Sequence, residues 1–386
     1  MSRLEELIQQ HCPDGVEFKP LGEVCDIKGR IGFRGYTRQD LVEEANGAIT
    51  LSPSNITNQE LNYENCSYIS WAKYEESPEI KVAVGDVIFT KTASVGKTAL
   101  VKYLPKEATI NPQLVVLKNI QCNPAFLAFV LKSYRFQSEV AKLQGVGSVP
   151  NISQTALSGI TIPVPPLPVQ EEIVRILDNF AELQAELQAE LQKRLQQYNY
   201  YRDNLLSFEG RTDIEWKKLG EIAKISSGKN KQKKKEGAYP VYGSTGIIAY
   251  CDEFKYDKSL ILVARVGANA GFTHIASGQY DVSDNTLIID LDKKDVIQKY
   301  IFYILENINL NRYAKGGGQP LITAGEIKEI TIPIPSLSEQ QRIVDVLDRF
   351  DKLTNDISEG LPAEIEARRK QYEYYRDQLL TFKQKA

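Results

Sequence analysis

Histidine and methionine are scarce in this chain of 386 residues, which has only two histidines, His11 and His274, and one methionine. Metal sites built from several histidines are therefore nearly excluded. A Ser-His-Asp catalytic centre is disfavoured too, because a single histidine would have to serve it. The five cysteines are scattered and form no Cys-x-x-Cys pair. This pattern predicts reduced thiols and a cytoplasmic protein.

Long apolar runs and a strong positive charge are also missing. No segment approaches the ~20 apolar residues of a membrane-spanning helix, and the opening MSRLEELIQQHCPDG lacks the apolar core of a secretory signal. We therefore expect neither a membrane span nor a signal. The net charge is −3, so any contact with nucleic acid must depend on local positive clusters.

The sequence does contain a large duplication. The segment ITIPVPPLPVQEEIVRILDNF at 160–180 returns as ITIPIPSLSEQQRIVDVLDRF at 330–350, with 12 of 21 positions identical. The segment QYNYYRDNLLSF at 197–208 returns as QYEYYRDQLLTF at 371–382, with 9 of 12 identical. The period is far longer than the roughly 20–50 residues of solenoid repeats. It predicts two copies of one large module.

Each copy has the same predicted order of elements: a strand-rich region, a short helix, a glycine-containing loop, a proline-bounded extended segment and a long helix. In copy one we expect a hairpin at 85–99, a buried strand at 114–117 and a helix at 124–143. The matching segments of copy two are 258–271, 286–290 and 295–305. The Ile-Pro-x-Pro segments should be stiff, because each proline fixes φ and disfavours helix in the residue before it.

The two long helices carry apolar residues at spacings of three and four. Such narrow stripes suit a coiled-coil seam, and the two helices can bury them most simply against each other. At ~1.5 Å per residue, 169–208 would extend about 60 Å. The first helix contains the repeat AELQAELQAELQ at 181–192, and the second contains Gly-Leu-Pro at 360–362, which predicts a break or kink.

These features together resemble the DNA-specificity subunits of type I restriction–modification systems. The resemblance covers essentially the whole chain. It depends on the LEELI and CPDGVEFKPLGE opening, the two Ile-Pro-x-Pro…Gln…Ile-Val…Leu-Asp…Phe segments and the twin Gln-Tyr-x-Tyr-Tyr-Arg-Asp-x-Leu-Leu blocks. It implies an α+β fold with two pseudo-repeated mixed α/β target-recognition domains, at 1–165 and 210–336. Two long antiparallel helices in a coiled coil, at 166–209 and 337–386, would separate them.

The resemblance also implies a non-catalytic subunit that recognises a bipartite, asymmetric site on double-stranded DNA. Each domain would read one half-site, and the helices would set the spacing. Two methyltransferase subunits and restriction/motor subunits would be the partners. S-adenosylmethionine, ATP and Mg²⁺ are therefore expected on those partners, and no cofactor is expected in this chain.

Two other classes stay open. One is a coiled-coil scaffold that binds proteins and does not read DNA. The other is a self-contained methyltransferase or nuclease, which the motifs disfavour. Val95-Gly-Lys-Thr98 lacks the first glycine of a phosphate-binding loop, and Asn123-Pro-Ala-Phe126 lacks the second proline of the adenine-methyltransferase motif. The second motif is more typical of a helix N-cap followed by proline.

Two groups of residues are candidates for binding, although the loops that carry the first group could also be plain solvated surface. Basic and amide side chains near glycine-containing loops could contact phosphates or bases: Lys28, Arg30, Arg34, Arg38, Lys91, Thr92, Lys97, Ser148, Asn151, Lys229, Lys231, Lys233, Lys234, Lys235, Arg265, Lys315 and Gln319. Aromatic and basic side chains at the helix ends could dock partner proteins: Tyr198, Tyr201, Arg202, Tyr372, Tyr375 and Arg376. We expect no catalytic residue and no metal ligand.

Overall fold

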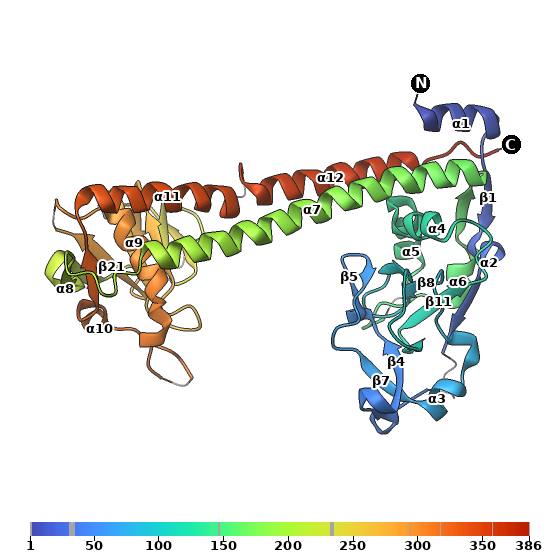
Figure 1. The fold of residues 1–386 in the computed structure, drawn as a ribbon, viewed down its shortest axis with the longest axis horizontal. Helices are drawn as coiled ribbons and strands as arrows, with labels where there is room; N and C mark the ends of the chain where they lie inside the picture. The colour runs from blue at the N-terminus through green and yellow to red at the C-terminus, as the bar shows by residue number, and fades with distance from the viewer. Residues whose placement is uncertain are drawn as a thin grey trace. The chain divides into compact units, whose positions relative to one another are not determined.

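The computed structural model describes residues 2–30, 35–145, 147–231, 235–292, 294–316, 318–356 and 358–385. The chain forms two compact units, each with one copy of the module (Figure 1). Unit 1 comprises Met1–Glu186 and Ile365–Ala386, and unit 2 comprises Leu187–Glu364. Helix α7 (Leu167–Leu205) gives its first part to unit 1 and its last part to unit 2.

Unit 1 contains a layered α/β domain with most of α12 packed against it. Its other helices are α1 (Arg3–His11), α2 (Leu21–Val24), α3 (Trp71–Glu75), α4 (Pro124–Lys132), α5 (Tyr134–Leu143) and α6 (Gln154–Gly159). Its strands are β1 (Glu17–Pro20), β2 (Asp26–Gly29), β3 (Leu41–Val42), β4 (Gly47–Leu51), β5 (Ile56–Thr57), β6 (Glu60–Leu61), β7 (Ser67–Ser70), β8 (Val87–Thr90), β9 (Thr98–Leu100), β10 (Ala108–Ile110), β11 (Leu114–Lys118) and β12 (Thr161–Val164).

Unit 2 repeats this plan with shorter connections. Its helices are α8 (Leu219–Ile222), α9 (Gln298–Ile308), α10 (Ala324–Lys328) and α11 (Leu337–Asn355). Its strands are β13 (Glu215–Lys218), β14 (Ala223–Ser227), β15 (Tyr239–Gly243), β16 (Gly246–Cys251), β17 (Tyr256–Asp257), β18 (Leu260–Ala264), β19 (Thr273–Ala276), β20 (Gln279–Val282), β21 (Thr286–Leu291) and β22 (Thr331–Ile334).

Three sheets recur in both units. The central sheet has the order β2-β11-β8-β9 in unit 1 and β14-β21-β18-β19 in unit 2. The second sheet has the order β10-β4-β7-β3 in unit 1 and β16-β15-β20-β17 in unit 2. The proline-bounded segments form the third as antiparallel pairs, β1 with β12 and β13 with β22. The strand that opens each module therefore lies beside the strand that leads into its long helix.

The central sheet is buried on both faces, which explains the continuous apolar runs in its strands. In β18, Ile261 and Val263 share a core with α9 and α11. Leu260 and Leu262 share another core with Tyr280 of the second sheet. The strands β8 and β11 of unit 1 alternate in the same way between two cores.

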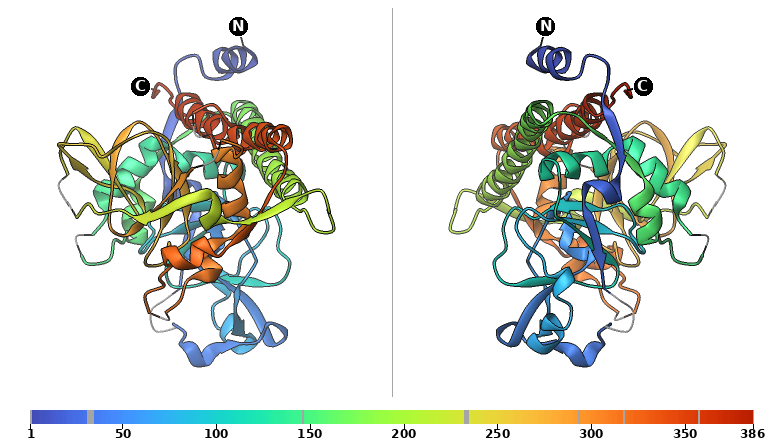
Figure 2. Two further views of the ribbon diagram at one scale, coloured as in Figure 1. Left: turned by 90° about the vertical axis from the view of Figure 1, so that its left-hand side faces the viewer. Right: turned by 90° about the vertical axis from the view of Figure 1, so that its right-hand side faces the viewer.

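The end of the chain pairs with its beginning in unit 1. The N–H of Val16 donates to the carbonyl oxygen of Lys383 at 2.8 Å, and the N–H of Lys385 donates to the carbonyl oxygen of Val16 at 2.9 Å. Figure 2 shows the C-terminal tail running beside the N-terminal strand. A side chain at Gly15 would collide with this tail, 2.7 Å from the Lys383 carbonyl oxygen, and its φ is +111°.

Several predicted elements are confirmed and one is wrong. The hairpins, the buried strands and the break before Pro362 are present, and α11 ends at Asn355 while α12 begins at Leu361. Gly360 allows this break, because a Cβ there would lie 2.6 Å from the Lys352 carbonyl oxygen. The helix predicted at 124–143 is two helices, which are divided at Ser133. Its hydroxyl caps α5 by accepting the N–H of Phe136.

Candidate nucleic-acid interface

Backbone hydrogen bonds join the hairpin of the central sheet to the glycine-containing loop in both units. In unit 1, Ala93 N–H donates to the Pro150 carbonyl and Ile152 N–H to the Lys91 carbonyl, both at 2.9 Å. In unit 2, Gly267 N–H donates to the Pro320 carbonyl and Ile322 N–H to the Arg265 carbonyl, also at 2.9 Å. We call this arrangement the hairpin–loop frame. It makes Lys91 and Arg265 structurally equivalent.

The frame carries different side chains in the two units. Thr92 forms a bridge with Asn151 in unit 1, whereas Val266 forms the matching bridge with Leu321 in unit 2. The predicted residues Lys91, Thr92 and Asn151 are therefore brought together. Ser148 is exposed in the same loop of unit 1, and Lys315 and Gln319 are exposed in the same loop of unit 2.

The basic loop of unit 2 lies at the same end of the central sheet as Arg265. Lys229 N–H donates to the Val282 carbonyl at 3.1 Å, and Arg265 N–H donates to the Asn285 carbonyl at 2.9 Å. Lys229, Lys231 and Lys235 are exposed. The predicted Lys233 and Lys234 lie outside the described residues.

Arg265 and Lys315 differ in how they are paired. The Nε of Arg265 is buried and has no hydrogen-bond partner among the described residues, which is uncommon for a buried donor. The ammonium of Lys315 lies 2.8 Å from Glu326 Oε1. This ion pair, together with hydrogen bonds from Thr323, lowers the pKa of Glu326 to about 2.

The basic residues predicted in the first copy are more dispersed. Lys28 is half-buried in β2, and Arg38 is exposed in a short 3-10 helix at 38–40. Arg34 lies outside the described residues. Lys91 is half-buried, and burial lowers its pKa.

Two predicted DNA contacts, the buried Arg30 and the exposed Lys97, donate to backbone carbonyls of their own domain. Arg30 is 5% exposed, and its guanidinium donates at 3.3 Å to the Ile110 carbonyl and to Thr109 Oγ1. The ammonium of Lys97 donates at 3.3 Å to the carbonyls of Pro53 and Ile56. Both residues therefore hold neighbouring loops in place, and we do not include them in the proposed DNA surface.

The repeated aromatic blocks pack in the same way in the two units. Tyr375 stacks on Phe180 at 5.6 Å in unit 1, and Tyr201 stacks on Phe350 at 5.5 Å in unit 2. The candidate partner residues Tyr198, Tyr372 and Arg376 are buried beside these pairs, and Arg202 is half-buried.

The most exposed aromatic side chains of these blocks are those of Tyr200 and Tyr374, which are 66% and 61% exposed. They belong to the aromatic and basic blocks predicted for docking, but they are not among the six residues singled out there. The signal was available in the sequence, because Tyr-x-Tyr-Tyr places the middle tyrosine on a different face of the helix from the first.

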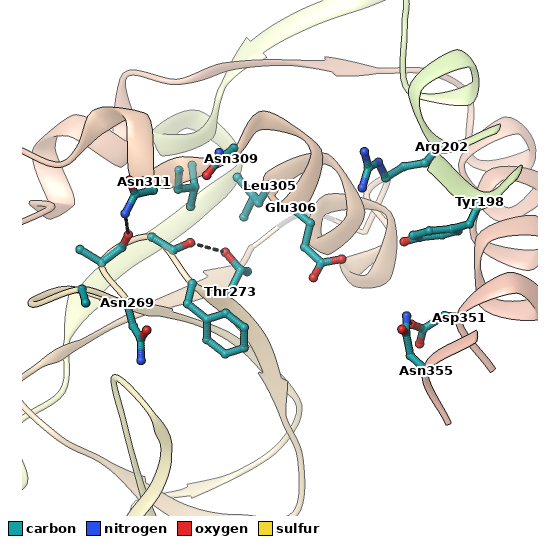
Figure 3. A pocket seen from close by; sticks show the side chains of 15 residues that line it. Tyr198, Arg202, Asn269, Thr273, Leu305, Glu306, Asn309, Asn311, Asp351 and Asn355 are labelled. Carbon is teal, nitrogen blue, oxygen red and sulfur yellow. Dashed lines mark hydrogen bonds between the residues drawn. The ribbon is translucent and has the colours of Figure 1, made fainter. Parts of the chain in front are cut away.

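A polar groove of about 450 Å³ lies within unit 2, between the hairpin tip, the end of α9 and the helices α7 and α11. Figure 3 shows Glu306, Arg202, Tyr198 and Asp351 pointing toward one space. Burial beside Asp351 raises the pKa of Glu306 to about 7, and the nearby Arg202 opposes this shift. Lys132 is the residue of unit 1 that is equivalent to Glu306. It contacts the hairpin β5–β6, where its ammonium donates to the Gln59 carbonyl at 3.1 Å.

Neither a membrane-spanning helix nor a metal-binding cluster is found in the described part of the chain. None of the helices there combines the length and the apolar character that crossing a membrane requires. No group of three or more His, Cys, Asp and Glu side chains is arranged there to hold a metal ion.

Comparison with known sequences gives the family. Residues 13–197 and 212–367 match the family described as the type I restriction modification DNA specificity domain. The chain belongs to this family. The predicted resemblance is thus confirmed, with one match in each copy.

Curated relatives carry the same description. The chain is 40% identical over 264 residues to the EcoR124I/EcoR124II type I restriction enzyme specificity subunit of Escherichia coli, a match to 60% of this chain and 65% of that protein. It is 33% identical over 303 residues to the putative type I specificity subunit S.MpnORF89P of Mycoplasma pneumoniae, a match to 72% of this chain and 88% of that protein. The chain thus spans only part of its E. coli relatives: 65% of the EcoR124I/EcoR124II subunit and 51% of the EcoprrI specificity subunit. These relatives are named as specificity subunits, in agreement with the prediction of a non-catalytic subunit.

Solved structures of this family confirm the predicted fold class. The S subunit of a type I restriction–modification system from M. genitalium aligns with a TM-score of 0.55 and 16% identity, over 95% of this chain and 96% of that one. A chain from a study of complex assembly and conformational transition of the type I system aligns with a TM-score of 0.63 and 18% identity, over 95% and 97%. Two pseudo-repeated mixed α/β domains and two long antiparallel helices are therefore the fold.

Proposed function

We propose that this chain is the sequence-reading subunit of a type I restriction–modification complex. Each unit would read one half of a bipartite, asymmetric site on double-stranded DNA. The observation that carries the proposal is the repeated hairpin–loop frame, which is held by the same backbone hydrogen bonds in both units. Lys91, Thr92 and Asn151 on one frame correspond to Arg265, Val266 and Leu321 on the other. One scaffold with different side chains suits two readers of different base sequences.

Different residues would serve affinity and specificity. Arg265 is the strongest candidate for reading a base, because it is half-buried on the hairpin–loop frame and arginine is the commonest reader of guanine. Lys229, Lys231 and Lys235 are exposed on a loop at the same end of the sheet and would contact phosphates. Local positive charge of this kind is compatible with the net charge of −3.

The helices would connect the readers and dock the partners. Two aromatic blocks with the same packing suit two copies of one partner, which we propose to be methyltransferase subunits, with restriction/motor subunits completing the complex. S-adenosylmethionine, ATP and Mg²⁺ would then belong to those subunits. The complex would act in the cytoplasm, where its DNA lies.

Binding to matched duplexes tests the proposal. The full chain, together with its methyltransferase partner, is titrated with duplexes that contain both half-sites or have one half-site scrambled. Scrambling either half should weaken binding by at least about a hundredfold, and binding should fall steeply as salt rises. Equal affinity for all the duplexes would contradict the proposal. Absence of salt-dependent binding would favour the alternative, a coiled-coil scaffold that binds proteins only.

A further inference from the structure

A buried glutamine stands in the first turn of each long helix, at equivalent positions. Gln170 of α7 is 3% exposed, and Gln340 of α11 is fully buried. Their neighbours on the same helices, such as Ile173 and Ile343, are apolar and fully buried. A polar side chain at this depth costs free energy unless its amide is fully hydrogen-bonded. Apolar packing of the junction alone would not require glutamine.

The two glutamines share two hydrogen bonds, and Gln340 makes a third, from its Nε2 to the Asp295 carbonyl at 3.1 Å. Gln170 Oε1 accepts the N–H of Asn123 at 2.8 Å, and its Nε2 donates to the Pro165 carbonyl at 2.6 Å. Gln340 Oε1 accepts the N–H of Ile297 at 2.8 Å, and its Nε2 donates to the Pro335 carbonyl at 2.8 Å.

The partners are the parts that meet at the junction. Asn123 and Ile297 are the N-cap residues of α4 and α9, the helices that cover the central sheets. Pro165 and Pro335 follow the strands β12 and β22, directly before the long helices. Each side chain thus links the domain helix, the proline-bounded connection and the long helix.

Other polar links at this junction are not shared by the two copies. In unit 2, the hydroxyl of Tyr300 donates to the Pro333 carbonyl at 2.9 Å, and the hydroxyl of Tyr303 donates to Asp348 at 2.5 Å. Because the glutamine bonds make Asn123 equivalent to Ile297, Tyr300 and Tyr303 correspond to Phe126 and Phe129 of unit 1. Phenylalanine has no hydroxyl with which to form these bonds. Among the described residues, the glutamine bonds are the side-chain hydrogen bonds between domain helix and long helix that both copies share.

We propose that Gln170 and Gln340 are positioning residues, which fix the angle at which each recognition domain leaves its long helix. Through this angle they help to set the gap between the two half-sites. The inference rests on the proposed function, because the gap has a meaning only if both units read DNA. Stiff prolines on one side and the N-terminus of the domain helix on the other leave the glutamine amide as the directional link between them.

The test changes each glutamine to methionine, which keeps the length of the side chain and removes every hydrogen bond of the amide. The Gln170→Met and Gln340→Met chains are assembled with their methyltransferase partners. They are then titrated with duplexes whose gap has the native length or is one base pair shorter or longer. We expect the preference for the native gap to fall by at least about fivefold, while the preferred half-sites stay the same.

Matched controls separate positioning from loss of stability. Val116→Ala and Ile288→Val remove apolar atoms from cores between the two sheets, away from the junction. These variants should lower the melting temperature without changing the gap preference. If Gln340→Met does not fold, the Gln170→Met chain, in which Gln340 is intact, still carries the test and should by itself weaken the gap preference.

The outcomes distinguish the inference from the proposed function. A wild-type complex that ignores the half-sites would contradict the proposed function and, with it, this inference. A wild-type complex that reads both half-sites, with an unchanged gap preference in every folded glutamine variant, would contradict this inference alone.

Discussion

Basic side chains in this protein differ in what they bind, and this difference decides which of them are available to DNA. Lys97 binds the carbonyls of Pro53 and Ile56, which are 44 and 41 residues away along the chain. Arg30 binds Ile110, which is 80 residues away. The sequence placed both in basic, glycine-containing segments, but it could not show that distant carbonyl groups fold against them. Arg265 was predicted from the same kind of pattern, and its Nε has no partner among the described residues.

Replacing Arg265 should therefore change specificity. Arg265→Ala should cost ~1–3 kcal/mol of binding free energy at the native site and relax the preference at one base pair. The measurement is a set of titrations with duplexes that vary each position of the half-site. Lys218→Ala is the control, because Lys218 lies in β13 and pairs with Glu329. Equal losses on all sequences would assign Arg265 to a phosphate instead of a base.

Glu306 should make the stability of unit 2 depend on pH. Because burial raises its folded pKa to about 7, well above the ordinary value, the ionised form destabilises the fold. The cost is absent below the unfolded pKa of about 4.3, develops as the pH rises toward 7, and is complete above it. Glu306→Gln should raise the melting temperature at pH 8 but not at about pH 3.3, one unit below the unfolded pKa. Solvent reaches this side chain, so we expect at most about 1 kcal/mol. An equal shift at both pH values would contradict the assignment.

The elements were predicted with uneven success, for physical reasons. The long helices, the hairpins and the break before Pro362 arise from apolar periodicity and from proline and glycine chemistry, which are local. The division between α4 and α5 was missed because Ser133 separates two apolar segments that continue the helical spacing. Packing of the AELQ repeat was also overestimated, since Leu183 is 51% exposed although it belongs to the predicted seam.

The AELQ repeat should act as a length standard. Deleting one unit removes about 6 Å of helix and rotates the far end of the helix by about 40°, close to the ~3.4 Å and roughly 35° of one base pair. The preferred gap should shrink by about one base pair, with both half-sites unchanged. Methylation-site sequencing of cells that carry the deletion measures this directly. Glu182→Gln, which leaves the helix length intact, serves as the control. Altered half-sites would contradict the prediction.

The exposed tyrosines of the repeated blocks should contribute to partner docking. Tyr200→Ala combined with Tyr374→Ala should weaken assembly with methyltransferase subunits by at least about tenfold, because exposed aromatic residues are frequent interface anchors. Sedimentation of mixed subunits would show the loss. Trp71→Ala is a control, since this exposed aromatic side chain lies on α3, apart from the tyrosine blocks. Assembly equal to wild type in the double variant would place the docking surface elsewhere.

For the whole molecule, duplication was the feature that the sequence revealed most directly. The family match falls once in each copy, and each copy repeats the strand order of the central sheet and the hairpin–loop frame. The domain boundaries at 165, 209 and 336 remain predictions. The base preferences could not be predicted, because they depend on how side chains from separate loops meet on each frame.

Methylation-site sequencing of a host with and without this gene tests the central claim most directly. If the two units read two half-sites, deletion of the gene should abolish methylation at one motif that consists of two different half-sites separated by a fixed gap. An unchanged set of methylated motifs, or the loss of an uninterrupted motif, would contradict the account.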